Sequence, residues 1–107
     1  MNLNVKAGWL IFSVLVLVGC DQSPQDRSGE AIYYRSCVSC HERGHGGAPI
    51  RGNKKQWDAR LAKGKQKVFE NLKQGYAGMP AKGACFSCSD QELERVLQYI
   101  IHSQRNN

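Results

Sequence analysis

The sequence predicts an all-α fold of about four short helices, and three observations support this prediction. Apolar side chains near the C-terminus recur with helical period and form one stripe, which consists of Leu93, Val96, Leu97, Ile100 and Ile101. Glycines separate the helical segments and are concentrated in a loop at Gly44–Gly52. No segment alternates apolar and polar residues for long enough to predict a strand.

The first two helices have clear start signals. Ser28 can cap a helix over Gly29–Ser36, which leads into the first pair of cysteines. Asn53 can cap a second helix over Lys54–Lys63, which Gly64 ends. The glycine-rich loop therefore connects these two helices.

Two further helices complete the fold. The third is expected over Gln66–Gln74 and stops at Gly75. Ser89 and Glu92 have the spacing of a capping box, which predicts that the last helix begins there.

Length and composition restrict the function. The chain has 107 residues, which allows one domain, and its five cysteines are many for that length. Acidic residues are too few and scattered for a paired-carboxylate hydrolase, and no phosphate-binding glycine loop occurs. The net charge of +6 is moderately basic and does not indicate nucleic-acid binding. Most enzymes that need a deep substrate cleft are therefore excluded.

The N-terminus has the pattern of an export signal. Ala7–Gly19 is mostly apolar and too short to span a bilayer comfortably, so residues 1–19 are expected to be a signal peptide. The segment Leu17–Cys20 resembles the lipobox of bacterial lipoproteins, in which the cysteine becomes the acylated mature N-terminus. Asp21 resembles an inner-membrane retention signal. The alternatives are an ordinary signal peptide with an incidental cysteine, or an uncleaved anchor.

The mature chain would begin at Cys20. Its first residues, 20–28, are polar apart from the cysteine and are expected to be a lipidated tether, followed by the domain over residues 29–104. This arrangement predicts a periplasmic protein that is lipid-anchored to the inner membrane.

Cys37, Cys40 and His41 form a C-x-x-C-H motif, which is typical of c-type haem attachment. The two thiols would bind one haem covalently, and the adjacent imidazole would ligate its iron. The alternatives are a zinc site or a redox pair. Zinc would need Cys85 and Cys88 as partners, but the gap of 44 residues exceeds the usual spacing. A thioredoxin-like site would expect a βαβ context, which is absent from the pattern.

The second cysteine pair, Cys85 and Cys88, is followed by Ser89 where a haem motif needs histidine, so a second haem is not expected. Outside the cytoplasm a disulfide between them is expected.

Iron held by His41 needs a sixth ligand or an open site. Met79 is the only methionine besides the initiator and stands in a Gly/Pro loop, which favours it as the ligand. His45 is expected to be solvated or near the haem edge. His102 falls in the last helical turn, where a basic side chain is favourable without any function.

These residues resemble the class I c-type cytochromes, most closely the cytochrome c5 group, over roughly Gly29–His102. The resemblance is carried by Gly29, Tyr33, Cys37, Cys40, His41, Gly47, Ala48, Pro49, Trp57, Arg60, Gly78, Met79, Pro80, Ala81, Lys82, Gly83, Cys85, Cys88, Ser89, Asp90, Glu92, Leu93, Tyr99 and Ile100.

The resemblance implies roles for several residues. The Pro49 carbonyl would accept a hydrogen bond from the His41 ring, and Trp57 would lie near a haem propionate. Gly29 and Tyr33 would pack the first helix against the last, and Cys85 and Cys88 would be bridged. Ala81 replaces a second proline that the group commonly has after Met-Pro, which would loosen the methionine loop.

The sequence therefore predicts a one-electron carrier rather than an enzyme, because iron with both axial positions filled offers no site for a substrate. Two alternatives stay open: a gas-binding or gas-sensing protein if Met79 binds weakly, and a haem subunit of a larger respiratory complex. The stretch from Arg51 to Lys82 contains two acidic residues, Asp58 and Glu70, and nine basic ones, which could form a docking patch for an acidic redox partner. The basic residues are Arg51, Lys54, Lys55, Arg60, Lys63, Lys65, Lys67, Lys73 and Lys82.

Overall fold

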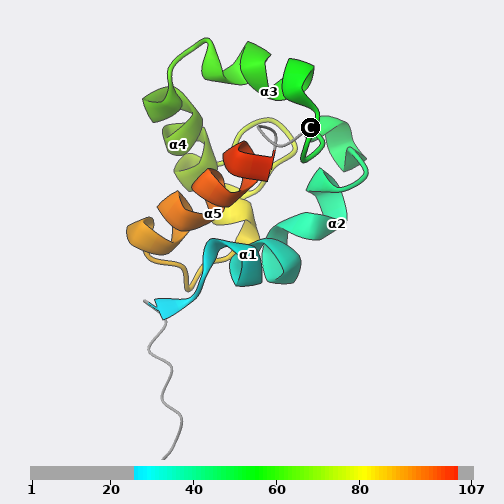
Figure 1. Cartoon of the computed structure of the whole chain (residues 1–107). Helices are drawn as coiled ribbons and strands as arrows, with labels where there is room; N and C mark the ends of the chain where they lie inside the picture. The colour runs from blue at the N-terminus through cyan, green and yellow to red at the C-terminus, as the bar shows by residue number, and fades with distance from the viewer. Residues whose placement is uncertain (1–25, 104–107) are drawn as a thin grey trace, which may run out of the picture.

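The computed structural model describes residues 26–103 as one helical globule (Figure 1). Its first helical segment runs without a break through α1 (Gly29–Ile32), a π-helical turn (Tyr33–Cys37) and α2 (Val38–His41). A short 3₁₀ turn at His45–Gly47 follows. The segment therefore carries the chain from the first cap to the predicted haem motif.

The other helices are α3 (Lys54–Leu61), α4 (Lys65–Gln74) and α5 (Asp90–Ser103). A 3₁₀ turn at Ala81–Ala84 lies between the last two. Within residues 26–103 the β structure is limited to an isolated bridge between Tyr76 and Met79. The predicted all-α class is confirmed.

The contact between α1 and α5 is close at Gly29. A Cβ atom at this position would lie 2.2 Å from the carbonyl oxygen of Arg95, so any larger residue would force the two helices apart. Tyr33 is fully buried, and its ring centroid lies 5.5 Å from that of Tyr99 on α5. The packing of the first helix against the last, implied for Gly29 and Tyr33, is present.

The core lies between α5 and the helices that surround it. Leu93, Val96, Leu97, Ile100 and Ile101 are all buried, as the helical stripe predicts. They pack with a group from the rest of the chain, namely Ile32, Tyr33, Cys37, Trp57, Leu72, Cys85 and Cys88. The core thus extends to both cysteine pairs. It is small, because few side chains contribute to it.

Three predicted caps are confirmed. The Ser28 hydroxyl accepts a hydrogen bond from the Ala31 amide at 3.1 Å, and Asn53 Oδ1 accepts one from the Gln56 amide at 3.1 Å. At the start of α5, the Ser89 amide donates to Glu92 Oε2 at 3.0 Å and the Glu92 amide donates to Ser89 Oγ at 3.2 Å. This is the complete capping box.

Helix boundaries differ from the predictions in three places. The first helix does not end at Ser36 but continues to His41, with an extra residue accommodated in the π turn, where the Val38 amide donates to the Tyr33 carbonyl. The second helix ends at Leu61 instead of Lys63, and the third begins at Lys65.

The predicted signal peptide, Cys20 and most of the tether lie outside the described residues. Among the helices that are described, none is long and apolar enough to cross a membrane.

Candidate functional site

The two cysteines of the C-x-x-C-H motif lie one turn apart on the first helical segment. Cys37 is buried and Cys40 is exposed, and neither thiol is bridged. Burial, and to a lesser extent the neighbouring Cys40, raises the pKa of the Cys37 thiol to about 11. The motif therefore presents one thiol toward the core and one toward solvent.

The imidazole of His41 is buried and oriented. Its side chain is only 6% exposed, and Nδ1–H donates to the Pro49 carbonyl oxygen at 2.8 Å. Because this bond fixes the proton on Nδ1, the other ring nitrogen carries a lone pair, and no hydrogen-bond partner for it is found among residues 26–103. The hydrogen bond that the resemblance implies between His41 and Pro49 is present in the structure.

The loop that carries Pro49 is tied to its surroundings on both sides. The Arg51 amide donates to the His41 carbonyl at 2.7 Å. From α3, Gln56 Oε1 accepts a hydrogen bond from the Ile50 amide at 2.8 Å, and the indole N–H of Trp57 donates to the Ile50 carbonyl at 3.0 Å. Helix α3 therefore holds the loop that orients His41.

Trp57 also contacts the histidine directly. The two rings are stacked, with centroids 5.9 Å apart and an interplanar angle of 26°. The indole is buried. Trp57 was expected near a haem propionate; in this structure its N–H donates to the Ile50 carbonyl.

A polar cluster lies beside the motif. The Tyr33 hydroxyl donates to Glu42 Oε2 at 2.7 Å, and Arg51 forms an ion pair with Glu42 at 3.3 Å while its guanidinium lies 5.0 Å from the Tyr33 ring centroid. Burial, and then the bond to Glu42, raises the pKa of Tyr33 to about 12. The hydrogen bonds from Tyr33 and Arg51 lower the pKa of Glu42. The cluster joins the first helical segment to the Pro49 loop.

Met79 lies in a tight turn. The amides and carbonyls of Tyr76 and Met79 bond reciprocally at 3.0 and 2.9 Å. The turn also needs Gly75, which has φ of +85° and whose Cβ would lie 2.9 Å from the Met79 carbonyl oxygen. The Met79 side chain is half-buried and packs against the core.

The methionine side chain approaches the cysteine motif at Gly83. A Cβ atom on this glycine would lie 3.5 Å from Met79 Cε and 4.0 Å from Cys37 Sγ, so both groups face the same small space. His45 and His102, the competing ligands, are both exposed. A 3₁₀ turn begins at Ala81, and the Gly83 amide donates a hydrogen bond to the Pro80 carbonyl at 3.0 Å.

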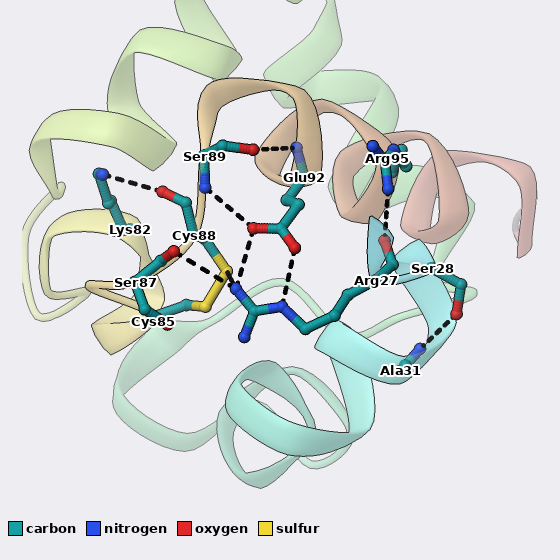
Figure 2. A network of polar contacts seen from close by, with 10 residues as sticks. All are labelled: Arg27, Ser28, Ala31, Lys82, Cys85, Ser87, Cys88, Ser89, Glu92 and Arg95. Carbon is teal, nitrogen blue, oxygen red and sulfur yellow. Dashed lines mark hydrogen bonds and ion pairs between the residues drawn. A yellow bond between two sulfur atoms is a disulfide. The ribbon is translucent and has the colours of Figure 1, made fainter. Parts of the chain in front are cut away.

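Cys85 and Cys88 are joined by a disulfide at the other end of this loop. Figure 2 shows Arg27 reaching across to it from the start of α1. Its guanidinium donates to Glu92 Oε1 at 2.7 Å and Oε2 at 2.9 Å, to the Ser87 carbonyl at 3.4 Å, and to Cys88 Sγ at 3.7 Å. The Glu92 side chain is completely buried, so this ion pair lies largely away from water.

Sequence reasoning did not find Arg27, which it assigned to the tether. The Arg27 carbonyl accepts a hydrogen bond from Arg95 at 2.7 Å, so the packed part of the chain begins two residues before the expected boundary at Gly29. Its partners lie 60 to 68 residues away in sequence, and no local pattern could have indicated them. Sequence reasoning also missed a shorter-range contact, in which Lys82 Nζ donates to the Cys88 carbonyl at 3.0 Å.

The donor set fits a covalently attached haem. Two unbridged thiols stand one turn apart, and the adjacent buried imidazole has one nitrogen without a partner among the described residues. An unpaired polar atom in a core is costly unless a ligand satisfies it, and iron would do so. The described residues hold no group of three or more His, Cys, Asp or Glu side chains that would bind another metal.

Comparison with known proteins shows the family of the chain. Residues 24–100 match the family described as cytochrome C oxidase, cbb3-type, subunit III. The chain is 31% identical to cytochrome c-555 of Chlorobaculum tepidum over 96 residues, which is 86% of this chain and 89% of the relative. It is 35% identical to cytochrome c5 of Ectopseudomonas mendocina, over 67% of this chain and 85% of the relative.

The structure also resembles a solved protein. It superimposes with a TM-score of 0.69 and 30% identity on a chain from the crystal structure of an electron transfer complex of nitrite reductase with cytochrome c, covering 75% of this chain and 98% of the other. The motif, the fold and these relatives agree: the chain belongs to the class I monohaem cytochromes c, which carry one covalently attached haem c.

Proposed function

We propose that the protein is a one-electron carrier whose haem is attached through Cys37 and Cys40 and whose iron is ligated by His41 and Met79. The observation that supports this most directly is the buried His41 ring, oriented by Pro49 with one nitrogen left for a ligand. The haem, when bound, supplies a one-electron change at iron. Met79 sulfur as a ligand beside His41 would favour the reduced state of the iron.

The residues of the chain would act mainly by positioning. Pro49 and Trp57 hold the imidazole so that it does not rotate, and Gly75 permits the turn that presents Met79. The exposed Cys40 marks the side on which the attached group would approach solvent, and electrons would pass to partners there.

The partners would be redox proteins, and we place the docking surface on α3 and the two residues after it. Five of the nine basic residues in the stretch Arg51–Lys82 form ion pairs within the chain, which reduces the charge that they present; they are Arg51, Lys54, Lys65, Lys67 and Lys73. Residues 54–63 still carry four basic side chains against Asp58 alone. This segment adjoins His41 through Trp57.

Charge reversal at Lys55 and Lys63 tests this surface. At low ionic strength we expect the double change to Glu to lower the second-order rate of electron transfer to an acidic redox protein by about tenfold, with a weaker salt dependence. The matched control reverses Lys65 and Lys67 on α4, which changes the net charge equally. Equal effects of both pairs in stopped-flow measurements would show that only total charge matters.

The sequence pattern also supports export and anchoring. We propose that residues 1–19 are removed and that Cys20 carries the lipid, so that residues 20–26 connect the inner membrane to a periplasmic domain that begins at Arg27. Several acyl chains would bind a bilayer firmly, at about 0.8 kcal/mol per buried methylene group.

Replacement of Cys20 by Ser tests the anchor. We expect the variant to be released from membranes into the soluble periplasmic fraction, while its haem content and visible spectrum stay those of the wild type. Membrane fractionation followed by haem staining would measure this. Retention of the variant at the wild-type level would refute lipidation.

A further inference from the structure

The disulfide loop Cys85–Cys88 displays an apolar side chain to solvent. Phe86 is 72% exposed, more than the other large exposed hydrophobic residues, Tyr34 at 52% and Tyr76 at 62%. The two cysteines of the loop are buried, and the Cys88 amide donates to the Cys85 carbonyl at 2.9 Å. The disulfide and this turn therefore hold Phe86 outward on a rigid support.

The N-terminal end of the described chain is fastened to the same loop. Arg27 contacts the Ser87 carbonyl and Cys88 Sγ, and it pairs with Glu92 immediately after the loop (Figure 2). Because Arg95 also holds the Arg27 carbonyl, both the backbone and the side chain of this residue are fixed. The Arg27 side chain thus links the start of the domain to the loop that bears Phe86.

The length of the preceding segment limits how far this face can lie from a membrane. Arg27 lies seven positions after Cys20, and even a fully extended chain over that stretch spans at most about 25 Å. A domain of this size has a diameter of about 30 Å, from a radius of gyration of about 12 Å. A lipid on Cys20 would therefore keep the start of the domain within about 25 Å of the bilayer, close enough for the loop that bears Phe86 to reach it.

We propose that the disulfide loop is a membrane-contact surface in which Phe86 inserts into the interface of the bilayer that holds Cys20. This proposal rests on the lipidation proposed above. Aromatic side chains favour the interfacial region of a bilayer. Around the loop, Arg27 is paired with Glu92 and Asp90 with Lys73, and Lys82 Nζ donates to the Cys88 carbonyl. We therefore assign the contact to the apolar Phe86 side chain rather than to headgroup charge. The contact gives the haem a fixed orientation relative to the membrane.

The test uses the lipidated holoprotein in oriented phosphatidylcholine bilayers, where linear dichroism of the haem absorption measures its orientation. We expect clear dichroism for the wild type and a loss of at least half of it in Phe86→Ser. Tyr34→Ser removes another exposed aromatic side chain, one outside the turn that presents Met79, and should retain the wild-type value. Amide hydrogen exchange in the loop should also be slower in the bilayer-bound wild type than in soluble Cys20→Ser.

Several results would overturn the proposal, and they are distinguishable. Wild-type dichroism and loop protection in Phe86→Ser, on a protein whose anchoring depends on Cys20, would refute the membrane contact alone. If Phe86→Ser kept the wild-type dichroism but transferred electrons more slowly to a redox protein, Phe86 would instead contact a protein partner. Membrane retention of Cys20→Ser would refute the anchor and the contact together.

Discussion

Replacement of Met79 by Ala is expected to remove the sixth iron ligand. The ferric protein should lose the weak charge-transfer band at the red end of the visible spectrum that sulfur ligation produces. Its reduction potential should fall by on the order of 0.1 V or more, within the ~0.8 V range that axial ligands control. The ferrous variant should bind carbon monoxide rapidly, because its iron has an open position. Absorption spectroscopy and a redox titration measure all three changes.

Met79→Leu separates ligation from packing. Leucine has nearly the volume of methionine, so the half-buried position stays filled and the stability cost should be below about 1.5 kcal/mol. The spectral changes should nevertheless equal those of the Ala variant, because the sulfur is gone. His45→Ala and His102→Ala should leave the spectrum unchanged. Retention of the band in Met79→Ala would refute the ligand assignment.

Replacement of Glu92 by Gln should destabilise the fold by about 2 kcal/mol, which is typical for a lost charge-assisted hydrogen bond in a buried site. Gln still suits the capping box, so the change removes the charge that faces Arg27 while the first turn of α5 keeps its cap. Asp58→Asn on α3 is the control, because its ion pair with Lys54 is exposed and should contribute less than about 0.5 kcal/mol. Denaturant unfolding followed by circular dichroism compares the two.

The same ion pair predicts a pH dependence. The hydrogen bond from Arg27 lowers the pKa of Glu92 from 4.5 to about 2, although burial of the carboxyl acts in the opposite direction. A lowered pKa in the folded state means that the pair contributes stability above pH 4.5 and loses it as the pH falls toward 2. The stability difference between wild type and Glu92→Gln should therefore shrink over that range. A difference that is constant from pH 6 to pH 2 would contradict the role of the charge.

The parts of the fold that sequence predicted well are those encoded locally. The capping box and the apolar stripe of α5 are contained within about 14 residues, so periodicity and side-chain type were sufficient. The cysteine spacing before His41 was equally local. The π turn at Tyr33–Cys37 was missed, because an extra residue inside a helix leaves no mark on a short and mostly polar segment.

Contacts between distant residues were harder to predict. Arg27 was assigned to a tether because its neighbours are polar, whereas its partner Glu92 lies 65 residues away. Trp57 was expected near a haem propionate and is buried. Its hydrogen bond to the Ile50 carbonyl depends on how the loop after His41 turns back. The Pro49 contact was anticipated only through the resemblance to a known family, since spacing alone does not specify it.

The central claim is that this cytochrome carries one electron at an iron whose axial positions are both filled by the chain. The most direct test is a redox titration of the purified wild-type protein, followed through its visible spectrum and repeated under carbon monoxide. We expect one reversible one-electron transition between two low-spin spectra, with no change on addition of the gas. Rapid formation of a carbon monoxide complex by the reduced protein would contradict the account and identify an open, gas-binding site.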